Sequence, residues 1–222
     1  MCGRYSFTQV PELDSIILPE EIDLSIEPRY NIAPSNYAPV ILQRDPRHIH
    51  YLRWGLVPIW ATDEEMGYSM INARVETLHQ KASFKNLLQE QRCLVLADGF
   101  YEWKRVGKKK HPHRIGVAGF APFYMAGLAS QWRRPDGTWL ETFTILTTGP
   151  NDLMSDIHDR MPVILPKSAA LRWLSPQESP EKLIRELCIP FDSAQMEAYE
   201  VGPGVGNVRN DDPSLISPFV EN

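Results

Sequence analysis

Hydrophobic residues along this chain fall into many short segments that either alternate with polar residues or run without interruption, and both patterns are typical of β-strands. The run from Cys93 to Asp98 is nearly all apolar, which predicts a strand buried on both faces. Turn signals at Gly107 and at Pro135–Gly137 predict hairpins. The other segments with a strand pattern are residues 39–42, 49–57, 70–77, 100–105, 114–117, 122–128 and 138–147.

Apolar residues at helical spacing predict a few short helices between these strands. In the last of them, Ser179 takes the N-cap position and Pro180 the first helical position. Many short strands, few helices, no internal repeat and no polar linker predict a single α+β domain over residues 1–222, with a mainly antiparallel, barrel-like sheet. The predicted helices cover residues 11–18, a segment that begins at 83, residues 150–155 and 166–174, and a segment that ends at 187.

The composition limits the class of protein. The 222 residues are 43% hydrophobic and 23% charged, which are ordinary values for a globular protein and exclude a disordered chain. The three cysteines are too few and too scattered for a disulfide framework or a zinc site. There is no secretory signal pattern, and the longest nearly apolar stretch, residues 116–129, is too short to span a bilayer. We therefore expect a cytoplasmic monomer without metal, cofactor or membrane contact.

The net charge of −5 argues against a dedicated nucleic-acid binder, but the charges are unevenly distributed. Acidic residues collect in segments 12–27 and 178–200, whereas basic residues collect in 104–110 around the expected turn at Gly107. Taken alone, such a basic run is typical of a solvated hairpin tip.

Cys2 is the first candidate for chemistry. If Met1 is removed, Cys2 carries a free α-amine beside its thiol, and these two nucleophiles can close a five-membered ring around one carbonyl carbon. The amine titrates near ~8 and the thiol near ~8.5, so both supply some reactive form at neutral pH. Taken alone, a cysteine in this position is more often a solvated residue of a loose terminus.

Three further polar residues are candidates for a site. Asn72 lies in an alternating segment with Arg74 and Glu76, a pattern also found in sheets with one solvated face. Glu102 is flanked by aromatic residues, so it is either solvated or buried with a raised pKa that suits proton transfer. His158 lies in a loop close to two aspartates, and a nearby carboxylate can fix its tautomer and raise its pKa.

Taken together, these stretches resemble the SRAP family, the SOS-response-associated peptidases that are also described as abasic-site processing proteins. One matching stretch alone is weak evidence, but here the stretches follow the family's order and cover nearly the whole chain. They are Met1–Tyr5, Arg29–Pro34, Trp54–Pro58, Ile71–Glu76, Ala97–Trp103, Ile157–Pro162 and Val205–Val208.

The resemblance implies a single domain with a β-barrel and flanking helices, and a mature protein that begins at Cys2. It also implies binding of single-stranded DNA and covalent capture of an abasic site, whose open-chain sugar is an aldehyde. The Cys2 amine would form an imine, and the thiol would then close a thiazolidine. By similarity, Asn72 forms hydrogen bonds near the Cys2 amine and the sugar. Glu102 moves protons during ring opening and loss of water, and His158 assists as acid or base.

The same resemblance implies a set of DNA contacts. Arg4 and Arg74 match phosphate-binding positions, and a guanidinium suits that role because it binds phosphate oxygens in pairs. Pro34 and Trp60 match positions that stack on bases or wedge the strand. The residues expected to line the same groove are Thr147 and Asn207.

The chain departs from the family pattern in two places. Ala61 follows Trp60 where the family often has a second aromatic residue, so the identity of the wedge is open. His113 and Arg114 follow Pro112 where the family tends to have an aromatic residue. Both departures concern the path of the DNA and neither touches the proposed chemistry.

Two other functions remain open from the sequence. The first is a cysteine peptidase of the N-terminal-nucleophile kind, in which Cys2 cleaves the Met1–Cys2 bond with His158 or Glu102 as the base. This cleavage is also compatible with a maturation step. The second is a non-covalent reader of modified DNA bases, whose activity would survive the Cys2→Ala substitution.

Overall fold

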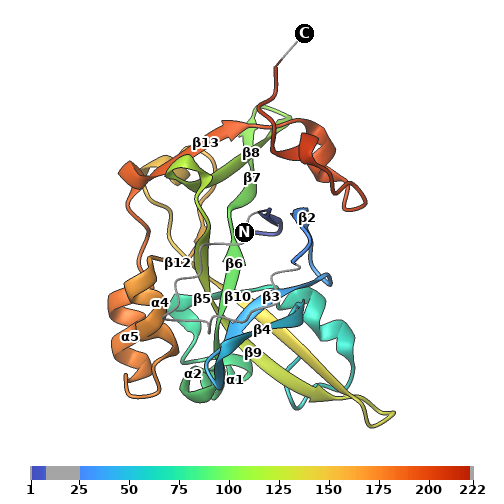
Figure 1. Ribbon diagram of the computed structural model, residues 1–222, viewed down its shortest axis with the longest axis vertical. Helices are drawn as coiled ribbons and strands as arrows, with labels where there is room; N and C mark the ends of the chain where they lie inside the picture. Colours follow the sequence, from blue (N-terminus) through green and yellow to red (C-terminus); the bar gives the residue numbers. More distant parts are fainter. Residues whose placement is uncertain (1, 9–25, 221–222) are drawn as a thin grey trace.

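Five strands close into a barrel, which lies in the lower half of Figure 1. The computed structural model describes residues 2–8 and 26–220. The strands pair in the order β10-β4-β3-β6-β9-β10, and every pair except β4–β10 is antiparallel. Their bounds are β3 (Tyr37–Leu42), β4 (Asp45–Trp54), β6 (Arg92–Ala97), β9 (Phe123–Arg133) and β10 (Trp139–Thr148).

A second sheet, antiparallel throughout its described strands, carries the N-terminal strand. Its order is β13-β8-β7-β1-β2. Only Asp98 separates β6 from β7, so the chain passes directly from the barrel into this sheet. Phe7, Phe100 and Ile115 belong to the same buried cluster as the barrel side chains, so one hydrophobic core serves both sheets. The strands are β1 (Tyr5–Phe7), β2 (Arg29–Ile32), β7 (Gly99–Val106), β8 (Lys109–Val117) and β13 (Met196–Glu200).

The helices are short and lie outside the sheets (Figure 1). They are α1 (Ala82–Lys85), α2 (Leu87–Glu90), α3 (Asp152–Ser155), α4 (Lys167–Leu174) and α5 (Pro180–Leu187), with 3₁₀ turns at Glu64–Ser69, Val75–Thr77, Ala118–Phe120, Ser193–Gln195, Pro203–Gly206 and Pro213–Ile216. Three short strands complete the fold, β5 (Asn72–Arg74), β11 (Met161–Pro162) and β12 (Ile164–Leu165). Within the described part of the chain, no helix is long and apolar enough to cross a membrane.

The fold class and several local predictions are confirmed. The structure is α+β, with a barrel and mainly antiparallel strand pairs. Every residue of β6 is buried, as the continuous apolar run predicts. Gly107 and Gly137 have φ angles of 61° and 87°, which suit the tight turns expected there. The Ser179 side chain accepts a hydrogen bond from the Lys182 main chain, as expected for an N-cap. The predicted helix at 11–18 lies outside the described residues.

Other boundaries differ from the predictions because contacts distant in sequence decide them. The strand expected at 70–77 is only β5, because the chain turns into a 3₁₀ helix at Val75 after pairing in parallel with β10. The helix expected from 83 is two single turns, α1 and α2. The strand expected at 49–57 ends at Trp54. Gly55 follows with φ of 119°, and a Cβ there would lie 2.6 Å from the Gly67 carbonyl oxygen, so only glycine fits.

Arg92, at the start of β6, ties two helix ends to the barrel. Its side chain is 1% exposed, and it donates hydrogen bonds only to main-chain carbonyl oxygens within the described chain. The acceptors on α2 and its neighbourhood are Leu88 and Gln89 (3.0 Å). Those at the end of α4 are Trp173 (2.6 Å) and Ser175 (2.7 Å). Arg92 therefore satisfies carbonyl groups that helix ends leave without partners.

Replacing Arg92 with methionine should lower the free energy of unfolding by roughly 3–5 kcal/mol. Each buried acceptor left without a donor costs about 1–3 kcal/mol, and several are affected at once. Urea denaturation followed by tryptophan fluorescence measures the change. Arg133→Met, at an exposed position of β9, is the matched control and should change stability by less than about 0.5 kcal/mol. Equal stabilities for the two variants would contradict this account of Arg92.

Candidate functional site

A buried hydrogen-bond network holds the N-terminal strand in place. Asp98 is fully buried between β6 and β7, and its carboxylate accepts from Ser6 Oγ at 2.6 Å and Thr8 Oγ1 at 2.6 Å. Arg114 Nη2 of β8 donates to the same carboxylate at 2.9 Å. Gly99 makes room for this arginine, because a Cβ there would lie 2.8 Å from Arg114 Nε. The network fixes β1, and with it the position of Cys2.

Asn72 holds the main chain of Cys2 from the other side. Its Nδ2 donates to the Cys2 carbonyl oxygen at 2.7 Å. Asn72 is delivered by β5, which pairs in parallel with β10 through the Asn72–Ile145 position. The Asn72 Oδ1 atom is buried and accepts no hydrogen bond from the described residues. It is therefore placed to accept one from an N–H or O–H group that enters beside Cys2.

Glu102 and His158 form the acid–base part of the site. Glu102, on β7, is 3% exposed, and burial raises the pKa of its carboxyl group to about 7, with a further rise from the charge of Asp159. His158 Nε2 lies 3.7 Å from Glu102 Oε2. The burial of Glu102 confirms one of the two alternatives that its aromatic neighbours predict. Its raised pKa lets the carboxyl group release and take up protons near neutral pH.

His158 differs from its prediction in the direction of its pKa. Burial lowers the pKa, and this outweighs the rise caused by Asp159, whose Oδ1 lies 2.9 Å from His158 Nδ1. The Arg160 main-chain N–H also donates to Nδ1 at 3.1 Å, which favours the neutral tautomer with its proton on Nε2, toward Glu102. Nε2 of His158 therefore faces the Glu102 carboxyl group, at a separation of 3.7 Å that is longer than a direct hydrogen bond.

The Cys2 thiol is close enough to Glu102 for the charge of the carboxylate to affect its pKa. Cys2 is fully buried, and burial raises the pKa of its thiol, with a further rise from the Glu102 charge. Its Sγ lies 3.8 Å from the Arg4 carbonyl oxygen. The thiol is therefore protonated at neutral pH and needs a base before it can attack. The structure thus brings Cys2, Asn72, Glu102 and His158 together.

Arg4 is bound by the C-terminal segment. Its Nη1 donates to Asn31 Oδ1 at 3.0 Å and to the Val205 carbonyl oxygen at 2.6 Å. Its Nη2 donates to the Gly206 carbonyl oxygen at 3.1 Å. Much of its hydrogen-bonding capacity is therefore directed at the protein, and its role as a phosphate contact stays a prediction. Asn207 follows this loop and is exposed.

The other residues predicted to contact DNA are spread over one rim of the barrel. Arg74 is exposed at the end of β5, opposite Thr147 of β10. Thr147 is fully buried, and its side chain accepts from Arg160 Nη2 at 3.4 Å. Trp60 is 55% exposed and Pro34 is half-buried in a turn before β3. Thr147 is thus covered by a neighbouring side chain, whereas Arg74 and Trp60 present theirs to solvent.

Arg160 is a residue of this region that the sequence patterns do not single out. Its guanidinium forms a two-point ion pair with Glu76, at 2.6 and 3.0 Å, and donates to the Thr147 carbonyl oxygen at 2.5 Å. It joins the loop that carries His158 to β10 and to the turn after β5. Glu76, alternating with Asn72 in the sequence, is the one signal that could have indicated a partner for it.

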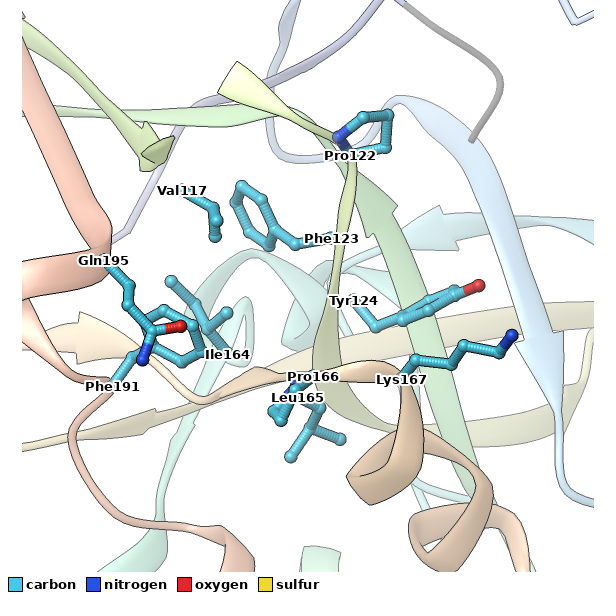
Figure 2. A pocket seen from close by; sticks show the side chains of 10 residues that line it. All are labelled: Val117, Pro122, Phe123, Tyr124, Ile164, Leu165, Pro166, Lys167, Phe191 and Gln195. Atoms are coloured by element: carbon cyan, nitrogen blue, oxygen red, sulfur yellow. The ribbon is translucent and has the colours of Figure 1, made fainter. Parts of the chain in front are cut away.

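No group of residues in the described ranges is arranged to hold a metal ion. A hollow of about 280 Å³ lies between the start of α4, β12 and the start of β9 (Figure 2). Its walls are mainly apolar, with Tyr124, Lys167 and Gln195 as polar tips. Its lining includes none of the four residues Cys2, Asn72, Glu102 and His158. This hollow is therefore separate from the candidate site.

Comparisons with known proteins point in one direction. The family model described as "SOS response associated peptidase (SRAP)" matches residues 1–208. The abasic site processing protein YoqW of Bacillus subtilis is 46% identical over 97% of this chain and 99% of its own length. The abasic site processing protein YedK of Escherichia coli is 36% identical over 98% of this chain and 100% of its own length.

Solved structures agree with the sequence relatives. A protein from Bacteroides thetaiotaomicron has a TM-score of 0.79 and 31% identity over 86% of this chain and 85% of its own. A protein from Bordetella bronchiseptica has a TM-score of 0.74 and 27% identity over 90% of this chain and 100% of its own.

The buried carboxyl group should make stability depend on pH. Folding raises the pKa of the Glu102 carboxyl group. The contribution of this group to stability is therefore fully present below the pKa that it has in the unfolded chain, and it is lost as pH rises toward 7. Glu102→Gln cannot ionise. The difference in unfolding free energy between this variant and the wild type should therefore change in favour of the variant between about pH 4.5 and pH 8, by up to roughly 3 kcal/mol.

Urea denaturation at both pH values measures this difference. Glu90→Gln, at an exposed position of α2, is the matched control and should show no such growth. A constant gap between wild type and Glu102→Gln would mean that the carboxyl group is solvated.

Proposed function

This chain belongs to the SRAP family, and from that premise we propose that it processes abasic sites in single-stranded DNA by capturing their aldehyde on Cys2. The observation that carries the proposal is the convergence of the Cys2 main chain and thiol with Asn72, Glu102 and His158. An N-terminal aminothiol needs an electrophilic carbon as its partner, and the open-chain abasic sugar provides one. The names of the sequence relatives support the same class of lesion.

The proposed reaction forms two bonds to one carbon. The Cys2 amine attacks the aldehyde carbon, and the resulting carbinolamine loses its oxygen as water to give an imine. The thiol sulfur then adds to the imine carbon and closes a thiazolidine. The amine and the thiol each give up one hydrogen, and both leave in the water with the aldehyde oxygen. The ring therefore forms without any oxidant or reductant, and it masks the aldehyde that promotes strand cleavage.

The pKa directions set the order of these steps. The thiol is protonated because burial and Glu102 raise its pKa, so the amine is the first nucleophile. Protonated Glu102 gives a proton to the departing oxygen, and the resulting carboxylate then accepts the thiol proton as sulfur adds. His158, 3.7 Å away, returns or removes the proton between steps. Asn72 positions Cys2 through its carbonyl group and offers Oδ1 to the sugar.

The exposed residues on the neighbouring rim support the proposed DNA binding. In this proposal Arg74 contacts a phosphate and Arg4 lies close to the lesion, and the Asn207 loop lies beside Arg4. Exposed Trp60 and the Pro34 turn offer surfaces on which bases stack, worth about 1–3 kcal/mol per base. Buried Thr147 shapes the wall of this path through its contact with Arg160.

The proposal requires that Met1 be removed, since otherwise the Cys2 nitrogen is an amide. Glu102 or His158 can serve as the base when the Cys2 thiol attacks the preceding carbonyl carbon. Peptidase activity is thus proposed as a maturation step in the protein's own chain. Intact mass of the wild type and of Glu102→Gln, expressed in the same cells, tests this step. Equal and complete loss of Met1 from both would assign the removal to a host enzyme.

Cys2→Ala should abolish a covalent complex with DNA. Purified protein that begins at Cys2 is mixed with a single-stranded oligonucleotide that carries one abasic site, and a denaturing gel separates the products. We expect a slow band with the wild type and none with Cys2→Ala, because alanine has no sulfur to close the ring. Cys188→Ala, at a buried cysteine of the C-terminal half, is the matched control and should retain the band.

The intact mass of the complex distinguishes the proposed bond from other linkages. Addition of the oligonucleotide with loss of one water is the expected mass, and it should resist borohydride because a thiazolidine is not an imine. No band from protein shown to lack Met1 would reject the proposed function.

The rate of capture should have a bell-shaped dependence on pH. The reaction needs protonated Glu102, with a pKa of about 7, and a free amine, whose pKa is near ~8. The fraction with both groups in their reactive states therefore peaks at about pH 7.5. Glu102→Gln should slow capture by roughly 10²–10⁴-fold and remove the decline on the alkaline side. Single-turnover rates between pH 5.5 and 9.5 measure the profile, and an unchanged alkaline limb in the variant would assign that limb to another group.

A further inference from the structure

The hairpin between β7 and β8 concentrates positive charge at a distance from the site. Residues 104–110 contain five lysine or arginine residues and no acidic residue, in a chain whose net charge is −5. Arg105 and Lys108–Lys110 are exposed, and Lys104 is half-buried. In Figure 1 this hairpin extends to the top of the view, away from α1 and α2. We call residues 104–110 the basic hairpin.

The cations of the basic hairpin have no carboxylate partners within the described part of the chain. Several arginines elsewhere on the surface do have them. Arg29 pairs with Asp211, and Arg44 pairs with Glu141. Arg172 is bound to two glutamates of the α5 region. The charge of the basic hairpin is therefore directed at solvent, and no other described side chain neutralises it.

The register of the hairpin places one pair of like charges opposite each other. Arg105 pairs directly with Lys110. Directly opposed side chains on antiparallel strands lie about 4.5–5.5 Å apart at Cβ, and like charges there destabilise the pair. An anion between Arg105 and Lys110 would relieve that repulsion, and a phosphate group has the size and charge to contact both. The hairpin thus tolerates a local cost that an anionic partner would offset.

The hairpin is also connected rigidly to the candidate site. Glu102 lies on β7, only three residues before Arg105. Burial is the main cause of the lowered pKa of His158, and the charge of Arg105 makes a minor contribution to it. At about 3.3 Å per strand residue, Arg105 and Lys108–Lys110 lie roughly 10–20 Å along the hairpin from Glu102. A stacked nucleic-acid strand advances about 3.4 Å per nucleotide, so this distance corresponds to roughly three to six nucleotides from the lesion.

We infer that the basic hairpin binds the phosphate backbone of the DNA strand on one side of the abasic site, about three to six nucleotides away. The inference rests on the proposed function, because it takes the captured strand as the partner. The partner is a polyanion of regular spacing, which fits a row of exposed lysines better than a single small anion does. The hairpin adds affinity for lesions within a longer strand and takes no part in the chemistry at Cys2.

Reversible binding to a DNA length series tests the inference. The probe is a fluorescent single-stranded oligonucleotide with a tetrahydrofuran abasic analogue, which has no aldehyde and cannot be captured. Three probes are compared. In the first, about two nucleotides flank the lesion on each side. In the other two, either the 5′ flank or the 3′ flank is extended to about twelve nucleotides. For the wild type, extension on one side should tighten binding by at least about tenfold at low salt, and extension on the other side should matter much less.

The variant Lys108→Gln/Lys109→Gln/Lys110→Gln should lose that tightening. Each single-strand phosphate contact contributes about −0.7 to the slope of log K against log salt, so its slope on the long probe should be shallower by up to about 2. The matched control is Arg47→Gln/Lys85→Gln/Arg133→Gln. It removes the same charge at exposed positions of β4, α1 and β9, which form no ion pair within the described chain. It should keep both the length effect and the salt slope.

Three results would overturn the inference. They are a length effect that persists in the lysine variant, an equal loss in the matched control, and no length effect in the wild type. The capture assay with a true abasic oligonucleotide separates this failure from that of the proposed function. If the wild type captures the lesion while the lysine variant keeps its length effect, only the role of the basic hairpin is wrong. If the wild type captures nothing, the proposed function itself is wrong.

Discussion

The candidate site depends on the hydrogen bonds that the buried carboxylate of Asp98 accepts. β1 has only three residues, so its ladder hydrogen bonds alone hold it weakly, yet Cys2 must stay within reach of groups on two other strands. Asp98 joins Ser6 and Thr8 of the N-terminal segment to Arg114 of β8. A buried ion pair is worth little against a well-packed apolar pair, but the loss of one member leaves a buried charge uncompensated. The network therefore specifies where the N-terminal segment lies more than it adds to overall stability.

Burial also determines the chemistry of the groups that this network positions. In water, a glutamate carboxyl group ionises near ~4.3 and a cysteine thiol near ~8.5, so neither suits proton transfer at pH 7 without adjustment. In the site, burial brings the pKa of Glu102 to about 7 and drives that of the Cys2 thiol upward. The two shifts act together, because a carboxylate beside the thiol raises the thiol's pKa further. In the proposed reaction, this one desolvated region thus supplies both a usable acid and a second nucleophile that stays inactive until a base is generated.

Much of the fold could be predicted because it rests on local physical rules. The buried run of β6, the turns at Gly107 and Gly137, and the cap at Ser179 follow from apolar continuity, positive φ and a side-chain acceptor, all readable within a few residues. The length of β5 could not be predicted. Its alternating residues suggest a longer strand, but after three residues paired with β10 the chain turns into a 3₁₀ helix at Val75.

The site shows the same division. Cys2, Asn72, Glu102 and His158 are recognisable by residue type and by resemblance, and the structure brings them together. The predicted direction of the pKa shift of His158 was wrong, because the sequence shows the neighbouring aspartates but not the burial of the loop. Asp98 and Arg160 were missed as positioning residues. A polar residue at the end of a strand usually marks a turn, and the partners of Arg160, Glu76 and Thr147, are distant in sequence.

The distribution of charge is compatible with the proposed binding of DNA by a chain with net charge −5. At physiological ionic strength, exposed charges interact over about 8 Å, so a strand of DNA experiences only the side chains near its path. Many of the acidic residues are already neutralised locally, as Glu178 and Glu186 are by Arg172. Arg74 and the cations of the basic hairpin have no such partner within the described chain. The potential along the path is therefore set by the few cations that the protein leaves unpaired, and the total charge is a poor guide to what this surface binds.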